Sequence, residues 1–138
     1  MNIMLLLKPK SELGYVREKS SLRQAMEKMR NCGYAAIPVV DSEGRYVGTV
    51  REGDCLWKLV EKPMDVQQME KVPLSEVIDR EFNPPVNITV RIDELLLRVI
   101  RQNFVPVVDG RNMLIGIITR RTVLQHYYDL THGEEKQN

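Results

Sequence analysis

An internal repeat constrains this sequence more than any other feature. The segment Ile37–Asp41 (IPVVD) returns 68 residues later as Val105–Asp109 (VPVVD). Each copy is followed by a polar turn and a second apolar strand, in which Gly48 corresponds to Gly116. Because self-similarity at a fixed spacing is typical of repeated supersecondary units, the chain is predicted to fold as two copies of one unit.

An amphipathic helix is predicted before each of these strands. Ser21 and Gln24 form a capping box at the start of the first helix, and Gly33 supplies its C-terminal stop. The offset between the copies is 70 residues here, so the second copy lacks two residues before its strand. The apolar positions, spaced i, i+3, i+4 and i+7, are Leu22, Ala25, Met26 and Met29 in the first copy and Ile92, Leu95, Leu96 and Val99 in the second.

The repeat divides the chain into four parts. We expect a first repeat with its N-terminal lead-in at 1–62, a polar connector at 63–73, a second repeat at 74–130 and a flexible tail at 131–138. A half of about sixty residues buries too little surface to be stable alone. The two sheets are therefore expected to pack face to face as one pseudo-symmetric unit.

Composition limits the class of function. The 138 residues carry 20 Lys and Arg against 19 Asp and Glu, and such balance argues against a dedicated nucleic-acid-binding protein, which needs a basic excess. The apolar run Ile3–Leu7 is too short to span a membrane and lacks the flanks of a secretory signal. Cys32 and Cys55 are isolated cysteines, which favours a reducing compartment. We expect a cytoplasmic protein without a membrane partner.

The segment Gly33–Gly48, read as GYxAIPVVDxxGxxVG, resembles the cystathionine-β-synthase (CBS) domain. Two tandem copies make a Bateman module, and the resemblance extends from about Met4 to Tyr128. It implies an α/β (α+β) fold with a pseudo-two-fold axis and β-α-β-β-α repeats. It also implies a non-enzymatic homodimer built on the helices, with two clefts for adenosine compounds such as AMP, ADP, ATP, S-adenosylmethionine, NAD or cyclic di-AMP.

A closer resemblance is to the small stand-alone CBS proteins of Gram-positive bacteria that bind cyclic di-AMP. They share the strand Gly33–Val39 (GYAAIPV) and the helix start Gly116–Arg121 (GIITRR). Their lead-in also touches the ligand, although its expected basic residue is Glu12 here. The ligand-binding residues implied by this resemblance are Leu13, Gly14, Tyr34, Ala35, Ala36, Thr119, Arg120 and Arg121.

The segment Thr119–Arg121 also points to an anion on chemical grounds. Thr119 lies where a strand is expected to enter a helix, so it is a natural N-cap beside the positive end of the helix dipole. Arg120 and Arg121 add guanidinium groups that match phosphate oxygens, and the base of a nucleotide could lie against Tyr34. The alternative is that Thr119 merely caps the helix and the arginines are solvated.

The second cleft is expected to be weaker or vacant. The family motif G-h-x-T-x-x-D is split: the second copy keeps Thr119 but lacks the aspartate, and the first keeps Asp54 but has Arg51 in place of the threonine. The residues implied for this cleft are Arg51, Asp54 and Val86. Asp54 is equally well explained as an acid in the first turn of a helix.

No catalytic arrangement is visible in the sequence. His126 and His132 lack the neighbours that a metal site needs, and no paired carboxylates or nucleophile–base pair stands out. We therefore expect no metal and no cofactor beyond a regulatory adenine nucleotide, with cyclic di-AMP preferred over AMP or ATP, and a signal passed to a separate protein partner. The alternatives are a ligand-free scaffold or dimerisation module, and a nucleic-acid binder acting through Arg120 and Arg121.

Overall fold

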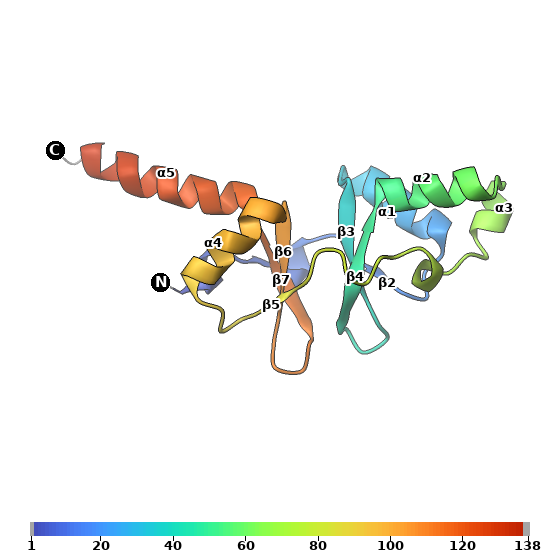
Figure 1. Cartoon of the computed structure of the whole chain (residues 1–138), viewed down its shortest axis with the longest axis horizontal. Helices are drawn as coiled ribbons and strands as arrows, with labels where there is room; N and C mark the ends of the chain where they lie inside the picture. Colours follow the sequence, from blue (N-terminus) through green and yellow to red (C-terminus); the bar gives the residue numbers. More distant parts are fainter. Residues whose placement is uncertain (1, 137–138) are drawn as a thin grey trace.

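The structure, a computed structural model, describes residues 2–136 and consists of two sheets with helices on their outer sides (Figure 1). One sheet has the strand order β2-β3-β4 and the other β1-β7-β6-β5. The elements are η1 (Ile3–Leu6), β1 (Lys8–Pro9), η2 (Lys10–Glu12), β2 (Val16–Arg17), α1 (Leu22–Cys32), β3 (Ala36–Val40), β4 (Tyr46–Arg51), α2 (Glu52–Glu61), α3 (Val66–Met69), η3 (Leu74–Glu76), β5 (Val86–Asn87), α4 (Ile92–Arg101), β6 (Phe104–Val108), β7 (Leu114–Thr119) and α5 (Arg120–Lys136).

The two repeats are related by a pseudo-two-fold axis, as predicted. In the first hairpin Ala36 lies opposite Arg51, and in the second Phe104 lies opposite Thr119, 68 residues later in each case. The hairpins meet at their turns, where an isolated bridge joins Arg45 to its own counterpart, Met113. The two flanking hydrogen bonds exchange under the same symmetry: Tyr46 N donates to Asn112 O at 2.9 Å, and Leu114 N donates to Gly44 O at 3.0 Å.

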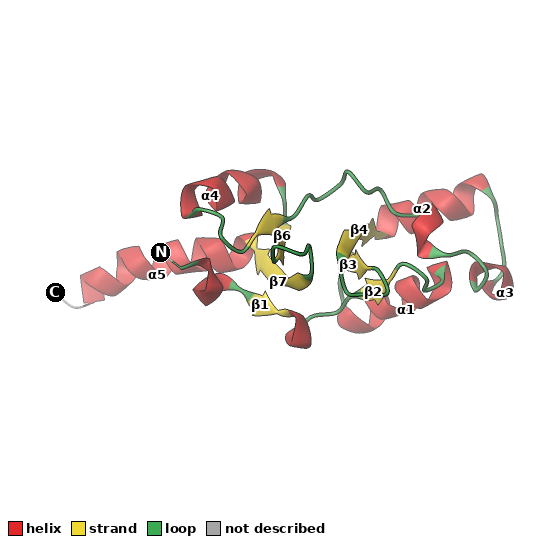
Figure 2. Cartoon of the chain, turned by 90° about the horizontal axis from the view of Figure 1, so that it is seen from below, coloured by secondary structure: helices red, strands yellow, loops and turns green. Residues whose placement is uncertain are grey.

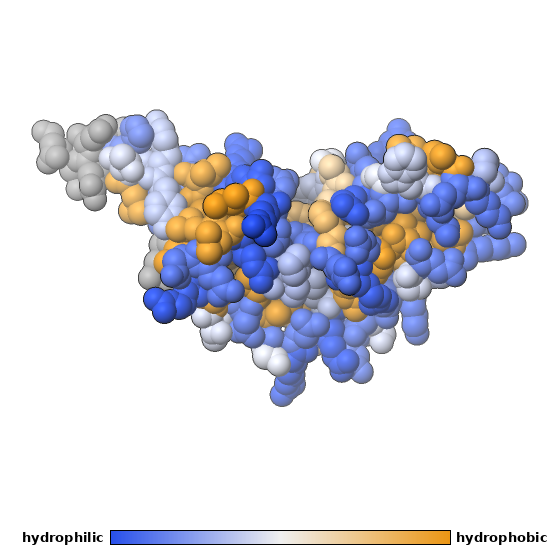
Figure 3. Space-filling model, in the orientation of Figure 1, coloured by the Kyte–Doolittle hydropathy of each residue, from blue (hydrophilic) through white to orange (hydrophobic). Residues whose placement is uncertain are grey.

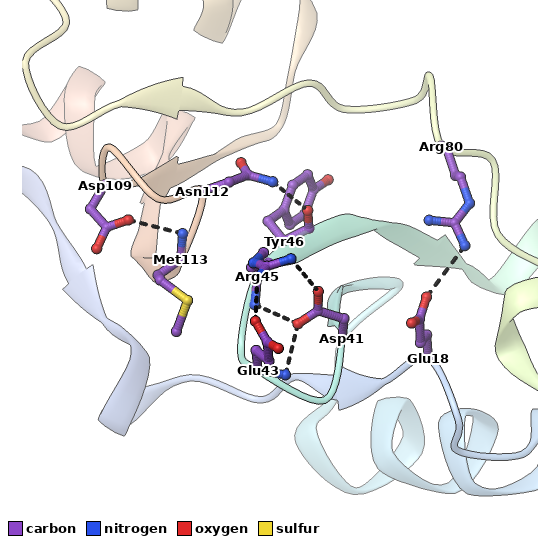
Figure 4. A network of polar contacts seen from close by, with 9 residues as sticks. All are labelled: Glu18, Asp41, Glu43, Arg45, Tyr46, Arg80, Asp109, Asn112 and Met113. Carbon is purple, nitrogen blue, oxygen red and sulfur yellow. Dashed lines mark hydrogen bonds and ion pairs between the residues drawn. The ribbon is translucent and has the colours of Figure 1, made fainter.

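An aspartate shapes each of these turns. Oδ1 of Asp41 accepts hydrogen bonds from the backbone N–H groups of Glu43 and Arg45 (Figure 4). Oδ1 of Asp109 accepts the equivalent bonds from Arg111 and Met113. The backbone hydrogen bond from Arg45 is the main reason why the pKa of Asp41 lies below its usual range. The side chain of Asn112 then reaches across the axis and donates to the carbonyl oxygen of Tyr46 at 3.1 Å.

The prediction for the first helix is confirmed. Ser21 caps α1 through a capping box with Gln24, and Gly33 ends the helix in the left-handed conformation at φ 71°. Leu22, with Ala25 and the rest of the predicted apolar face, turns toward the sheet and belongs to the core of the first repeat.

The lead-in segments are exchanged between the repeats. Ile3 and Leu6 of η1 are buried in the core of the second repeat, whereas Leu74 of η3 is buried in the core of the first. Strand β1 accordingly pairs with β7 (Figure 2), while Asp79 makes a single bridge to Thr49 at the edge of β4. The order of the repeats in the sequence predicts instead that each lead-in belongs to the repeat that it precedes. The exchange arises because each lead-in completes the open edge of the opposite hairpin.

Helix α5 continues past Leu130, the end predicted from the sequence, to Lys136. Contacts one turn apart support this extension: Tyr128 stacks on His132 with ring centroids 3.9 Å apart, and Thr131 Oγ1 donates to the Tyr127 carbonyl at 3.0 Å. The last part of the tail predicted to be flexible, 137–138, lies outside the described residues. Within those residues, no helix is long and apolar enough to cross a membrane.

Candidate functional site

A cavity of about 340 Å³ lies between the two repeats. Figure 3 shows a notch between the two lobes at the upper edge of the molecule, where β7 ends and β3 begins in Figure 1. Its lining comes from both repeats and both lead-ins. The lining residues are Lys8, Gly14, Gly33, Tyr34, Ala35, Ala36, Pro38, Phe82, Asn83, Asn103, Phe104, Ile117 and Thr119.

The chain places the walls of this cavity at junctions between helices and strands. Gly33 turns the chain out of α1, so that Tyr34 enters the cavity just before β3 begins. On the opposite wall Thr119 ends β7, and its Oγ1 accepts a hydrogen bond from Thr122 N at 3.1 Å. Thr119 therefore caps α5, as its position in the sequence predicted.

The chemistry of the lining suits a flat anionic ligand. Lys8 is the one charged side chain among the lining residues, and its Nζ donates a hydrogen bond to the hydroxyl of Tyr34 at 2.9 Å. Three aromatic rings, Tyr34, Phe82 and Phe104, provide apolar faces. Concave sites of this size, apolar with a few polar groups, are typical of small-molecule binding.

The structure brings most residues of the predicted site together. Gly14, Tyr34, Ala35, Ala36 and Thr119 all line this one cavity. They come from the lead-in, from the start of β3 and from the end of β7, so residues about a hundred positions apart in sequence face the same space. Their role as ligand contacts stays a prediction.

The other three residues predicted for this site lie around the cavity. Leu13 is buried in a small cluster with Phe104 and Ile117, so it supports the wall from behind. Arg120 donates from Nε to the carbonyl oxygen of Val99 at 2.7 Å, which ties the start of α5 to the end of α4. Arg120 and Arg121 line a separate surface groove along α5. Any contact between them and a ligand in the cavity stays a prediction.

The residues expected in the second cleft are engaged with one another or buried. Arg51 Nη2 lies 2.9 Å from Asp54 Oδ1, and the Asp54 carboxylate also accepts from the backbone N–H of Arg51. The guanidinium of Arg51 covers the ring of Phe82 at 3.9 Å from its centroid. Val86 is buried in the core of the second repeat, away from this pair.

A buried polar network is centred on Asn83, which also lines the cavity. Asn83, with φ 63°, donates from Nδ2 to Thr49 Oγ1 at 3.2 Å, and its Oδ1 accepts from Gln102 Nε2 at 2.8 Å. The hydroxyl of Tyr46 donates to the Asn83 carbonyl at 2.8 Å, and burial raises the pKa of Tyr46 to about 12. The side chain of Asn83, which borders the cavity, is therefore held by protein partners.

Sequence reasoning missed several residues of the cavity. Lys8 reaches it because β1 crosses to the other repeat, and no local pattern encodes that long-range pairing. Phe82 and Asn103 lie in irregular segments outside the repeated motif. The one usable signal was the position of Lys8 directly after the buried apolar run of the first lead-in.

Across residues 2–136, no group of three or more His, Cys, Asp and Glu side chains is arranged to hold a metal ion. The two cysteines are free thiols, with Cys32 exposed and Cys55 buried.

Two curated relatives share sequence with this chain. One is an uncharacterized protein of Methanocaldococcus jannaschii, 34% identical over 129 residues, which cover 86% of this chain. The other is the inosine-5'-monophosphate dehydrogenase of the same organism, 28% identical over 112 residues, which cover 80% of this chain. This chain spans 30% of the length of the first relative and 21% of the second.

Solved structures share the fold over nearly the whole chain. CbpB in complex with c-di-AMP matches with a TM-score of 0.91 and 20% identity, covering 100% of this chain and 91% of that one. The CbpB protein of Listeria monocytogenes in complex with c-di-AMP matches at 0.85 with 22% identity, covering 96% and 98%. The CBS-domain family model matches residues 7–61 and 73–129. The chain is therefore a tandem pair of CBS domains and belongs to that family.

Proposed function

We propose that this CBS pair is a non-enzymatic regulatory module of the cytoplasm, which binds an adenine nucleotide between its repeats and passes the signal to a protein partner. The preferred ligand is cyclic di-AMP. The proposal rests above all on the cavity itself, where Tyr34, Ala35, Ala36 and Thr119 converge from two repeats. Because both repeats and both lead-ins contribute walls, a ligand there can bias their relative position.

Each part of an adenine nucleotide has a counterpart in the lining. The ring of Tyr34 and the small side chains of Ala35 and Ala36 leave room for a base against the start of β3. Thr119 offers a hydroxyl at the N-terminus of α5, where the helix dipole favours a phosphate. The two solved CbpB structures of the same fold hold c-di-AMP, which supports this ligand over AMP or ATP.

The helices offer a surface for assembly of two copies. Leu97 and Ile100 of α4 and Leu124 of α5 are exposed, and Figure 3 shows hydrophobic residues gathered over these neighbouring helices. Leu56 and Trp57 are exposed on α2 of the other repeat. We propose that two copies of the chain associate through these helix faces to form a homodimer. Ligand binding in the cavity then changes the surface that the homodimer presents to the partner protein.

A thermal-shift panel tests the nucleotide proposal. Purified protein is melted with AMP, ADP, ATP, S-adenosylmethionine, NAD and cyclic di-AMP. A ligand at a hundred times its dissociation constant adds about 2.7 kcal/mol to the free energy of unfolding, a shift of about five to ten degrees for this size of domain. Tyr34→Leu removes the ring and the hydroxyl from the cavity and is expected to abolish the shift.

Tyr128→Leu is the matched control, because it removes an exposed tyrosine ring outside the cavity. A shift with cyclic di-AMP in the wild type and in Tyr128→Leu, but not in Tyr34→Leu, supports the proposal. A shift with AMP or ATP alone would support a nucleotide sensor whose ligand is not cyclic di-AMP. No shift with any nucleotide contradicts the sensor and favours a ligand-free scaffold.

A further inference from the structure

Lys8 stands out among the residues that line the cavity. It lies on β1, the short strand that the N-terminal segment contributes to the opposite repeat. Its ammonium group donates to Tyr34 OH at 2.9 Å and lies 5.6 Å from the centroid of that ring. Within the described residues no carboxylate lies within 4.0 Å of it, whereas several arginines are held in ion pairs. Its positive charge is thus available to a ligand.

The arginines at the start of α5 are less well placed for this role. Arg120 is bound to the carbonyl oxygens of α4, and Arg121 faces the surface groove along α5. Lys8, in contrast, lines the same cavity as Tyr34, which would contact the base of the nucleotide, and Thr119, whose hydroxyl would contact a phosphate. A half-buried ammonium without a carboxylate partner binds an anion more strongly than an exposed one, because water screens it less.

The position of Lys8 is fixed by close packing of the backbone. Lys8 pairs with Ile117 and Pro9 with Gly116 across the β1–β7 ladder. A Cβ atom at Gly116 would lie 2.3 Å from the Lys8 carbonyl oxygen, so the glycine is what allows β1 to approach. Buried Ile3 and Leu6 anchor the segment from the other end.

We propose that Lys8 is the anion-binding group of the cavity and that it recognises a phosphate of the ligand. This inference rests on the proposed nucleotide function, and it assigns part of that recognition to the N-terminal strand. A bound phosphate would then hold β1 against β7, so that ligand binding stabilises the docking of the N-terminal segment.

Two probes test this assignment separately. Inorganic pyrophosphate tests the anion contact alone. Its binding is monitored in ¹H–¹⁵N NMR spectra through the chemical shifts of the backbone amides of Gly14, Ala35 and Thr119. Cyclic di-AMP, followed by calorimetry, reports on the whole ligand. Both are applied to the wild type, Lys8→Met and Lys8→Arg. Lys10→Met is the matched control, since Lys10 lies on the same segment over the ring of Tyr15 and does not line the cavity.

Lys8→Met is expected to abolish the pyrophosphate response at the cavity amides and to weaken cyclic di-AMP by about tenfold or more, as for loss of a charge-assisted hydrogen bond. Lys8→Arg and Lys10→Met should behave more like the wild type, and similar melting of the two methionine variants shows that both are folded. A wild type whose cavity amides ignore pyrophosphate, or a Lys8→Met variant that responds like the wild type, overturns the assignment. A Lys8-dependent response to pyrophosphate without binding of cyclic di-AMP would support Lys8 as the anion-binding group and contradict cyclic di-AMP as the ligand.

Discussion

Ala36 and Phe104 occupy the same position of the two repeats and line the same cavity with side chains of very different size. Each begins the first strand of its hairpin, opposite Arg51 and Thr119 respectively. Ala36 leaves space at the cavity wall, whereas the ring of Phe104 is buried against Leu13 and Ile117. The pseudo-symmetric positions therefore give this one cavity an open side at Ala36 and an aromatic wall at Phe104.

The two cysteines should differ sharply in reactivity. Burial raises the pKa of the Cys55 thiol to about 11, with the nearby carboxylate of Asp54 adding to the effect. At pH 8 we expect iodoacetamide to modify exposed Cys32 and to leave Cys55 unmodified until the protein is unfolded in denaturant. Mass spectrometry of tryptic peptides measures both sites. Equal modification of the two cysteines in the folded protein would show that the Cys55 thiol is not buried.

Tyr46 should make stability depend on alkaline pH. Its pKa is about 12 in the folded protein against an ordinary value of 10.0, because burial disfavours the phenolate. The unfolded chain thus loses this proton first. The contribution is fully present below pH 10 and is lost as the pH rises toward 12, by at most about 1.4 kcal/mol per pH unit.

Tyr46→Phe isolates this contribution, because it removes the titrating hydroxyl and its hydrogen bond to Asn83. At neutral pH the variant should be less stable by about 1 kcal/mol. Urea denaturation across the alkaline range should show the advantage of the wild type shrinking as the pH rises. A difference that stays constant up to pH 12 would contradict the assigned pKa.

The residues of the site divide by how local their signals are. Tyr34, Ala35 and Thr119 lie within the repeated motif, directly beside a glycine stop or a helix cap, so their positions could be predicted from sequence. Lys8 and Phe82 enter the cavity through contacts between distant segments. Arg120 has the same sequence signal as a phosphate ligand, but the carbonyl oxygen of Val99 lies within its reach and binds it.

At the scale of elements, the hairpins and their helices follow from the sequence, whereas the exchange of the lead-ins does not. Periodicity and the capping box define α1, and the repeated strand–turn–strand pattern defines both hairpins. The apolar residues of η1 showed only that this segment is buried. Which core receives them is decided by the free edge of β7, and that edge exists only once the second hairpin has formed.

Gly116→Ala tests the docking of β1. The added Cβ would meet the Lys8 carbonyl oxygen at 2.3 Å and Leu7 Cδ1 at 2.8 Å, so the strand must move. We expect a loss of about 1–3 kcal/mol in the free energy of unfolding, as for overpacking of a core. Chemical denaturation monitored by circular dichroism gives this value.

Gly53→Ala is the control for that variant. Gly53 lies in α2 with nothing within 4 Å of an added Cβ, so alanine should leave stability unchanged or raise it by up to about 1 kcal/mol. If Gly116→Ala is as stable as Gly53→Ala, β1 does not pack on β7 in the way described.

At the scale of the whole molecule, contacts across the pseudo-two-fold axis hold the two repeats together. The reciprocal hydrogen bonds between the turns, the exchanged lead-ins and the ion pair of Arg80 with Glu18 (3.3 Å, Figure 4) all cross between the repeats. Melting should therefore be a single transition without a stable half. Two transitions that differ in ligand response would contradict this cooperativity.

The contacts of the predicted site residues also determine the expected stoichiometry of the complex. The cavity beside Tyr34 is open, whereas Arg51 and Asp54, the residues expected in the second cleft, are bound to each other. We expect one nucleotide per chain. Two equivalent nucleotides per chain, found by calorimetry, would show that the contact between Arg51 and Asp54 opens on binding.

The most direct test of the central claim is calorimetric titration of cyclic di-AMP into the wild type and Ala35→Trp. Ala35 is exposed at the rim of the cavity, so tryptophan there fills the space without disturbing the core. The account predicts saturable binding of one ligand per chain in the wild type and none in the variant. Equal binding by both proteins would place the ligand elsewhere, and no binding by the wild type would contradict the claim that this cleft senses cyclic di-AMP.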